Sequence, residues 1–379
     1  MKEEPQLNFK ISKRIFFNAL SVVSRAISAN SPLPWLTGIK IEIKDGELTL
    51  TGSDSDISIQ KVIQKNDEEY VFDIKSEGSI VIEAKYILDI VRKIDADEIM
   101  FQVLDGNLTK ISGHSAEFNI NGMKSSEYPS IDFTMPTKQF EINADQLLKI
   151  ITQTSFATSD KETRPVLTGV NFKCEGNTLE CVATDSFRLA KKTIKLDSEN
   201  RFNVTIPAKT LGEVAKTIER DVKVLVCISD KKAQFWIDNT VIQTRLIDGL
   251  YPETSRLIPQ EFLYELTLDS RDILNAIDRA SFIKSEGVSI IKLSASGKEI
   301  LISSKSQEVG SSLEKLTAIH YKGNPLEISF SGRYVFDAVR VLNGTVVKIE
   351  FSGEMKPFII RNAEDDSILQ LILPVRTYS

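Results

Sequence analysis

The fold is decided by the stretch TGVNFKCEGNTLECVATDSFRLA, residues 168–190. Apolar and polar residues alternate on both sides of its central EGN, which is the pattern of two antiparallel strands joined by a turn and buried on one face. The pattern recurs in TGIKIEIKDGELTLTGSDSDISI, residues 37–59, and in SIIKLSASGKEILISSKSQEVG, residues 289–310. We therefore expect one hairpin unit to occur three times along the chain.

Two helical segments accompany each hairpin, because apolar residues recur there with a period near 3.6. The predicted helices cover residues 11–27, 83–94, 142–158, 207–220, 268–284 and 331–342. Ser12, Asn143 and either Asp269 or Ser270 are expected to cap the helices that precede the hairpins.

A pair of strands closes each copy, ending near Pro129, Pro252 and Pro374. Copies of this size can each bury a complete core, so a chain of 379 residues is expected to form an α+β protein of three domains. The predicted domains are residues 1–135, 136–258 and 259–379.

The composition excludes several classes of protein. The N-terminus MKEEPQLNF has two glutamates and no apolar run, and no stretch approaches the roughly 18 apolar residues that span a bilayer. We expect a soluble, cytoplasmic protein with no membrane segment. Cys174, Cys181 and Cys227 form no metal-binding spacing and are expected in the core. Since the chain has two histidines and no glycine-rich phosphate loop, no metal, cofactor or catalytic residue is predicted.

Charge is distributed unevenly along the chain. The segment 11–27 carries Lys13, Arg14 and Arg25 and no acid, and the six predicted helices together are basic, although the whole chain has a net charge of −6. Basic helices on an acidic body indicate a surface that contacts phosphates without reading bases. An alternative is that lysine and arginine are simply good helix formers.

The carboxylates Asp54, Asp56 and Asp185 raise an alternative function, since such a cluster could serve a hydrolase or hold Mg²⁺. However, Asp54 and Asp185 occupy equivalent positions in two copies, at the end of a hairpin, and the third copy has Ser303–Lys305 there. Repeated placement favours turn residues that accept backbone hydrogen bonds.

Several motifs, in this order, carry a resemblance to a known family: TRPVLTGV, ATDSFRL, YPETSRLIP, MKPFIIR and QLILPVRTY. Together with the threefold repeat they resemble the bacterial sliding clamp, the beta subunit of DNA polymerase III, from Leu7 to Tyr378. SDSDISI and QLILPVRTY look most like the Gram-positive branch.

The resemblance implies a ring of two three-domain chains joined head to tail, with helices lining the inside and antiparallel sheets outside. Such a homodimer would encircle double-stranded DNA without sequence preference and act as the processivity factor of the replicative polymerase. The matching DNA-contacting residues are Lys13, Arg14, Arg25, Asn30, Lys161 and Arg164. The matching dimer contact joins Phe118 and Ile120 of one chain to Phe282 and Ile283 of the other; alternation alone would place Phe118 and Ile120 in a core.

The family also has a groove in which polymerase, clamp loader and repair proteins insert short apolar peptide motifs. Carried over to this sequence, the groove consists of Leu167, Thr184, Ser186, Phe187, Arg188, Leu189, Pro252, Arg256, Leu257, Pro357, Leu371, Leu373, Pro374, Val375 and Arg376. The expected chemistry is an apolar pocket for leucine and phenylalanine, with arginines and hydroxyls fixing the peptide backbone. Leu371 and Leu373 are also consistent with ordinary strand core.

Phe187 departs from the family, which usually has histidine at this position. The pocket is therefore expected to be more apolar and to lack one donor, which predicts a preference for larger or more aromatic anchors. Some relatives carry arginine where this chain has Asn30. A β-rich protein scaffold that does not encircle DNA is the second alternative function.

Overall fold

Each described helix begins at the residue after a strand ends. The computed structural model describes residues 6–65, 70–219, 221–284 and 287–376. In it α1 (Lys13–Ser24) follows β1 (Asn8–Ser12), and α2 (Ala84–Lys93) follows β6 (Gly78–Glu83). The other four are α3 (Ala144–Thr154), α4 (Ala208–Thr217), α5 (Ser270–Ala280) and α6 (Gly332–Arg340). All six predicted helices are confirmed, but their first residues belong to strands; residue 220, predicted in the fourth, lies outside the described residues.

One predicted cap is confirmed, and a second residue has the predicted N-cap position but makes no capping bond. The Asp269 carboxylate accepts hydrogen bonds from the N–H groups of Arg271 and Asp272 at the start of α5. Ser12 occupies the N-cap position of α1 but makes no such bond; its hydroxyl instead accepts the N–H of Val71, the residue before β5. The Ser12 hydroxyl thus binds the segment before β5 instead of the helix, and the cap at Asn143 stays a prediction.

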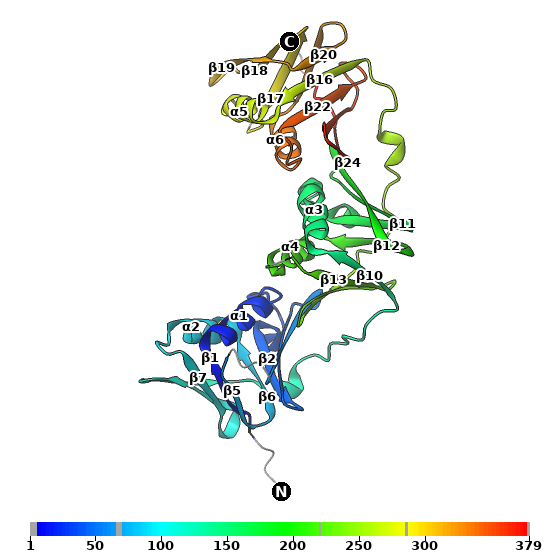
Figure 1. Ribbon diagram of the computed structural model, residues 1–379. Coiled ribbons are helices and arrows are strands. Elements are labelled where there is room, and N and C mark those ends of the chain that lie inside the picture. The colour runs from blue at the N-terminus through cyan, green and yellow to red at the C-terminus, as the bar shows by residue number, and fades with distance from the viewer. Residues whose placement is uncertain (1–5, 66–69, 220, 285–286, 377–379) are drawn as a thin grey trace. The chain divides into compact units, whose positions relative to one another are not determined.

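The chain divides into two compact units, residues 1–144 with 213–246, and residues 145–212 with 247–379. Each unit contains two sheets whose strands pair antiparallel throughout the described residues (Figure 1). The units divide the middle copy of the repeat, so the predicted domain boundaries stay a prediction.

The first unit contains a five-stranded and an eight-stranded sheet. The five-stranded sheet has the order β5 (Phe72–Ser76), β1, β7 (Glu98–Val103), β8 (Leu108–Gly113) and β9 (Ala116–Asn121). The eight-stranded sheet has the order β10 (Lys138–Asn143), β13 (Lys223–Ile228), β14 (Lys232–Ile237), β15 (Thr240–Arg245), β4 (Ile57–Gln64), β3 (Glu47–Ser53), β2 (Gly38–Lys44) and β6. Helix α1 packs against α2 and against β3 and β4.

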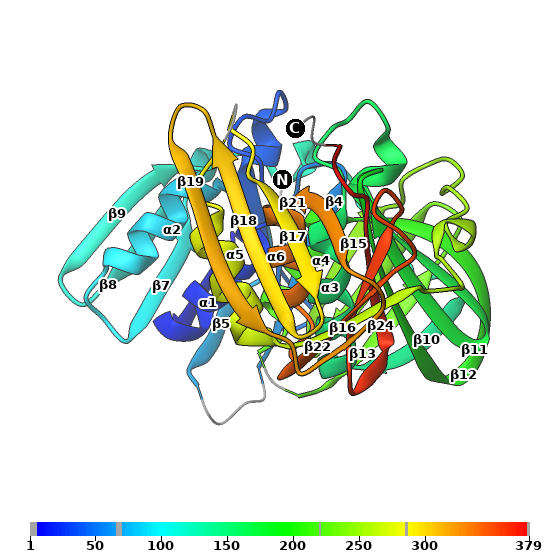
Figure 2. The ribbon, with the colours of Figure 1, turned by 90° about the horizontal axis from the view of Figure 1, so that it is seen from above.

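The second unit contains a seven-stranded and a four-stranded sheet. The seven-stranded sheet has the order β11 (Gly169–Thr184), β12 (Arg188–Pro207), β24 (Asp365–Ile372), β23 (Phe358–Asn362), β22 (Val346–Phe351), β16 (Tyr264–Asp269) and β20 (His320–Lys322). The four-stranded sheet has the order β19 (Gly310–Thr317), β18 (Glu299–Ser306), β17 (Ile290–Ser296) and β21 (Leu326–Ser331). Helix α5 packs against α6 and against β18 and β19 (Figure 2).

The threefold repeat is visible in the strand pairing. The order β4-β3-β2-β6 of the first copy reappears as β19-β18-β17-β21 in the third. In the second copy, residues 169–176 of β11 pair with residues 200–207, and residues 178–184 pair with residues 189–195. The register shifts between Gly176 and Thr178, where the turn was predicted.

The predicted alternation is confirmed as burial. Ile41 and Ile43 pair with Leu50 and Leu48, and all four are buried. The turn between them has positive φ at Asp45 and Gly46, as two-residue hairpin turns of type I′ require. The three cysteines are also buried, as predicted. Within the described part of the chain, no helix has the length and apolar character needed to cross a membrane.

Candidate functional site

The segment 184–188 forms a turn whose hydrogen bonds recur in the first copy at residues 53–57. Asp185 Oδ1 accepts the N–H groups of Phe187 and Arg188 at 2.9 and 3.0 Å. Asp54 Oδ1 accepts those of Asp56 and Ile57 at 3.0 and 2.9 Å. In both turns the hydroxyl of the last strand residue, Ser53 or Thr184, also accepts the backbone N–H two residues later.

The third copy has no aspartate in this turn. There the hydroxyl of Ser306, just beyond the predicted segment 303–305, accepts the N–H groups of Glu308 and Val309. The turn chemistry predicted for Asp54 and Asp185 is thus confirmed. Both carboxylates hold the backbone, which is a structural role rather than a catalytic one.

In the second copy this turn sends Phe187 and Arg188 in opposite directions. Ser186 has a φ of 79°, which turns the chain so that Phe187 is 58% exposed while Arg188 is 7% exposed. Phe187 is therefore available to a ligand, whereas Arg188 faces the interior of the unit.

The expectation that Arg188 contacts a peptide stays a prediction; in this structure each guanidinium nitrogen already has a partner within the protein. Nε donates to Asp185 at 3.1 Å, Nη1 to Asp337 at 3.0 Å and Nη2 to the carbonyl of Phe156 at 2.8 Å. The guanidinium also lies 4.5 Å from the ring centroid of Tyr334. Arg188 thus links the turn to α6 and supports the ring of Tyr334.

An apolar cluster lies beside this turn, where β12 pairs with β24. Leu189 pairs with Leu371, and both pack with Val182, Ile359 and Leu369. Partly buried residues complete the cluster: Tyr251, Ile258, Phe262 and Leu373. The cluster therefore contains three predicted groove residues, Leu189, Leu371 and Leu373.

The remaining predicted groove residues differ in exposure. Arg256 and Leu257 lie in a short 3₁₀ helix and are exposed, with Leu257 at 53%. Arg376 and Ser186 are exposed, and Pro252, Pro357, Pro374 and Val375 are half-buried. Leu167 and Thr184 are buried, and the Thr184 hydroxyl donates to the Arg188 carbonyl at 2.6 Å. Leu167 and Thr184 therefore face the interior rather than the solvent.

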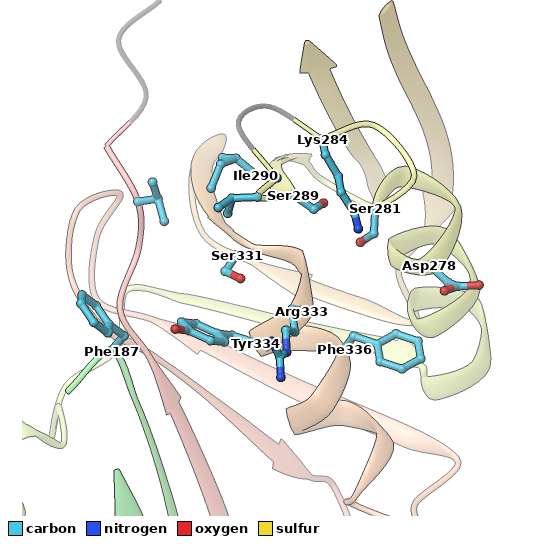
Figure 3. Close-up of a pocket in the computed structure, with 13 residues that line it drawn as sticks. Phe187, Asp278, Ser281, Lys284, Ser289, Ile290, Ser331, Arg333, Tyr334 and Phe336 are labelled. Atoms are coloured by element: carbon cyan, nitrogen blue, oxygen red, sulfur yellow. The ribbon is translucent and has the colours of Figure 1, made fainter. Parts of the chain in front are cut away.

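A hollow of about 620 Å³ continues from Phe187 and Val375 toward α5 and α6. Figure 3 shows Arg333, Tyr334 and Phe336 of α6 along one side of it. Burial raises the pKa of the Tyr334 hydroxyl, and nearby Asp185 adds to this rise. The sequence did not identify these residues of α6 as part of a site, because their apolar spacing predicts core packing only.

The residues predicted to contact DNA fall into two groups. Arg14, Asn30, Lys161 and Arg164 are exposed. Lys13 and Arg25 are half-buried, and they donate to the carbonyl of Ile94 and to the hydroxyl of Thr217. Lys13 and Arg14 also line a hollow with Asp95, Asp97 and Glu98, which reduces the positive potential there.

The four residues predicted at a dimer contact are accessible in the single chain. Phe118 is 38% exposed and Phe282 is 80% exposed, whereas Ile120 and Ile283 are half-buried. Phe118 and Ile120 lie on β9, which is the last strand of the five-stranded sheet. The exposure of Phe118 argues against the alternative that Phe118 and Ile120 belong to a core.

Comparison with known proteins gives one consistent family. The N-terminal, central and C-terminal domain models of the DNA polymerase III beta subunit match residues 7–132, 141–253 and 255–376. The chain is 41% identical to the beta sliding clamp of Bacillus subtilis over 378 residues, covering 98% of this chain and 100% of the relative. It is 38% identical to a beta sliding clamp of Staphylococcus aureus, with the same coverage.

Solved structures agree with these matches. The sliding clamp of Bacillus subtilis superposes with a TM-score of 0.95 at 41% identity, covering 98% of this chain and 100% of that one. A clamp from Bartonella birtlesii, solved bound to griselimycin, gives a TM-score of 0.92 at 26% identity, with the same coverage.

Proposed function

Because this chain belongs to the DNA polymerase III beta subunit family, we propose that its second unit holds partner proteins through the apolar cluster beside Phe187. The chain is a DNA sliding clamp, a non-catalytic processivity factor, and its fold consists of three clamp domains. The proposed partners are the replicative polymerase, the clamp loader and repair proteins, each carrying a short apolar motif.

One observation carries the groove: close in the chain to residues of the cluster of Leu189 and Leu371 are apolar side chains that stay exposed. Leu257 and Phe187 expose more than half of their surface, and Leu373 is only partly buried. Apolar side chains left accessible over a buried cluster favour leucine and phenylalanine anchors from a partner.

The equivalent position in the first unit supports this assignment by contrast. There Ser58 pairs with Gln243, as Leu189 pairs with Leu371, and Asp56 occupies the place of Phe187 in the turn. Asp56, Ser58 and Gln243 line a hollow of about 670 Å³. The equivalent place in the first unit therefore has polar residues where the second unit has the apolar Leu189 and Leu371 that a peptide anchor needs.

We propose that two chains close head to tail through the strands β9 and β19. Two junctions between copies lie within the chain, and in each the strand after the repeated turn pairs with the last strand of the next copy: β4 with β15, and β12 with β24. By the same rule, β19 requires a partner equivalent to β15 and β24, and that strand is β9. Both are terminal strands of their sheets, so each has unpaired backbone groups to offer.

The exposed basic residues are the proposed DNA contacts. Arg14 and Lys161 can reach phosphates, whereas Lys13, Arg25 and Arg164 each donate a hydrogen bond within the protein and are expected to contribute less. Asn30 is exposed and uncharged, so its contribution is a hydrogen bond at most.

The groove is tested by binding a fluorescent peptide that carries leucine and phenylalanine anchors. Leu257→Asp places a charge in the groove and is expected to weaken binding at least tenfold, since it removes an apolar contact and desolvates a carboxylate. Ile319→Asp is the matched control, because Ile319 is 52% exposed, similar to Leu257, and lies outside the cluster. Equal loss in both variants, or no loss in either, would contradict the groove.

A further inference from the structure

The hollow beside Phe187 has a polar end that the apolar groove does not explain. At this end lie Ser281 at the end of α5, Lys284 in the loop after it, and Ser289 before β17. Figure 3 shows the Lys284 side chain extending from that loop into the hollow. Three hydrogen-bond donors thus converge next to a surface that is otherwise built for apolar side chains.

Ser289 is the most informative of these residues. It is 9% exposed, and its hydroxyl has no hydrogen-bond partner among the described residues. A buried hydroxyl without a partner destabilises the free protein, so it marks a position where a ligand atom would be accepted. Because Ser289 lines the hollow, that ligand would be one that occupies it.

The N-terminus of α6 faces the same space. Ser331, at the N-cap, makes no side-chain bond to the helix, and the first turn contains no acidic residue. The Gly332 N–H donates to the Ser289 carbonyl, whereas the next two N–H groups have no partner within the helix. A Cβ at residue 332 would lie 2.7 Å from Ser281 Oγ and 3.1 Å from Ser289 Oγ, so glycine keeps the two hydroxyls and the helix end together.

The charges favour an anion in this place. The side chain of Arg333 is 81% exposed, and its distance to the Asp337 carboxylate, 3.9 Å, is long for an ion pair. Its guanidinium therefore remains accessible to a ligand. Lys284 is exposed as well. Among the described residues that line the hollow, Asp278 is the one carboxylate. Two cations, a helix N-terminus and serine hydroxyls are the donor set that proteins use for carboxylates.

We propose that this hollow binds a carboxylate of the partner segment whose apolar anchors occupy the groove. Phe187 and Val375 belong to the predicted groove and also line the hollow, so a segment leaving the anchors passes directly into it. The inference rests on the proposed groove and adds the chemistry of the residue next to the anchors: an acidic side chain or a terminal carboxylate.

The test uses full-length protein and acetylated, amidated peptides with two leucines and a phenylalanine as anchors. One pair carries two glutamates or two glutamines before the anchors, and a second pair carries them after. A glutamine peptide with a free C-terminus distinguishes a terminal carboxylate from a side chain. Fluorescence anisotropy at low and high salt is expected to show the glutamate form of one pair binding about three- to tenfold tighter at low salt, with the difference shrinking as salt rises.

The variants locate the carboxylate. Lys284→Gln combined with Arg333→Gln is expected to abolish the preference, and Lys298→Gln, which changes an exposed lysine outside the hollow, is expected to keep it. Ser289→Ala is expected to reduce the preference about threefold without lowering the melting temperature, because the hydroxyl it removes has no partner in the free protein.

Three outcomes overturn the inference, and they can be told apart. If wild-type protein binds peptides with and without a carboxylate equally well, the groove stands and the carboxylate site is rejected. If the preference survives in the double variant, the carboxylate is bound elsewhere. If no anchored peptide binds at all, the proposed groove fails, and the inference fails with it.

Discussion

At the scale of single residues, the turn 184–188 contains residues with two different roles: some have the structural role that the first copy repeats, and others are proposed to bind partners. Asp185 and Thr184 hold the backbone as Asp54 and Ser53 do in the first copy, and these roles could be predicted from the repeat. The role of Arg188 could not, because its partners Phe156 and Asp337 lie 32 and 149 positions away in the sequence. Tyr334 and Ser289 were missed for the same reason.

Phe187→His is expected to change which peptide anchors are preferred. Phe187 is 58% exposed beside the apolar cluster, so wild-type protein should favour larger or aromatic anchors, whereas histidine adds a donor and reduces the apolar surface. An affinity series over peptides with different anchors, measured on both proteins, checks this. The same order of affinities in both proteins would rule it out.

Arg188→Met is expected to destabilise the second unit by about 3 kcal/mol, since it leaves two carboxylates near each other without their shared cation. Both are more than four-fifths buried, with side-chain exposures of 13% for Asp185 and 16% for Asp337. Urea unfolding and the melting temperature measure the change.

Arg256→Met is the matched control for this loss, because Arg256 is exposed and should change stability by less than about 0.5 kcal/mol. Adding Asp337→Asn to Arg188→Met should restore part of the stability. If Arg188→Met and Arg256→Met are equally stable, Arg188 is a peptide contact rather than a support.

At the scale of secondary structure, most of the architecture was readable from the sequence. Period-two alternation located the paired strands, and helical periodicity located all six helices. Helix starts were placed too early, because each helix follows directly on a strand, and the Ser12 hydroxyl binds the N–H of Val71 before β5. The long pairing of β11 with β12 was also not predicted, since register across 20 residues depends on contacts that local patterns do not contain.

The edge strands β9 and β19 are expected to pair in a defined register. Superposing the junctions β4·β15 and β12·β24 on the third copy places Ser312 opposite Phe118 of the other chain, as Ile59 lies opposite Ile242. A Phe118→Cys, Ser312→Cys protein should therefore form a disulfide-linked dimer under mild oxidation, seen on a non-reducing gel.

The control for this cross-link moves one cysteine by a single residue. In Phe118→Cys, Ser311→Cys the second thiol points to the opposite face of the strand, so cross-linking should be much slower. The native thiols will not interfere, because all three are buried, and burial raises the pKa of Cys227 to about 11. Equal cross-linking of both variants would contradict the register.

At the scale of the whole molecule, function depends on closure rather than on tight contacts. The proposed DNA-contacting cations are few and the net charge is −6, so affinity for linear DNA should be weak and strongly reduced by salt. A closed ring would remain on DNA because it is linked to it.

This predicts that loaded protein stays on circular DNA and is lost from the same DNA after linearisation. Retention is measured by gel filtration of labelled protein after treatment with a clamp loader. Arg14→Gln with Lys161→Gln should slow loading but leave retention on the circle unchanged, because topology and not charge holds the ring. Equal loss from circle and line would reject encirclement, and would favour the scaffold alternative.

The two junctions inside each chain differ from the proposed β9·β19 junction in one respect. At β4·β15 and β12·β24 the paired strands belong to the same polypeptide chain. If their hydrogen bonds break, the covalent chain keeps the two copies together and the bonds can form again. The β9·β19 junction has no covalent backing. A ring of two chains consequently has two seams, and an enzyme that must pass DNA into it needs to break only one of them, which makes this junction the gate.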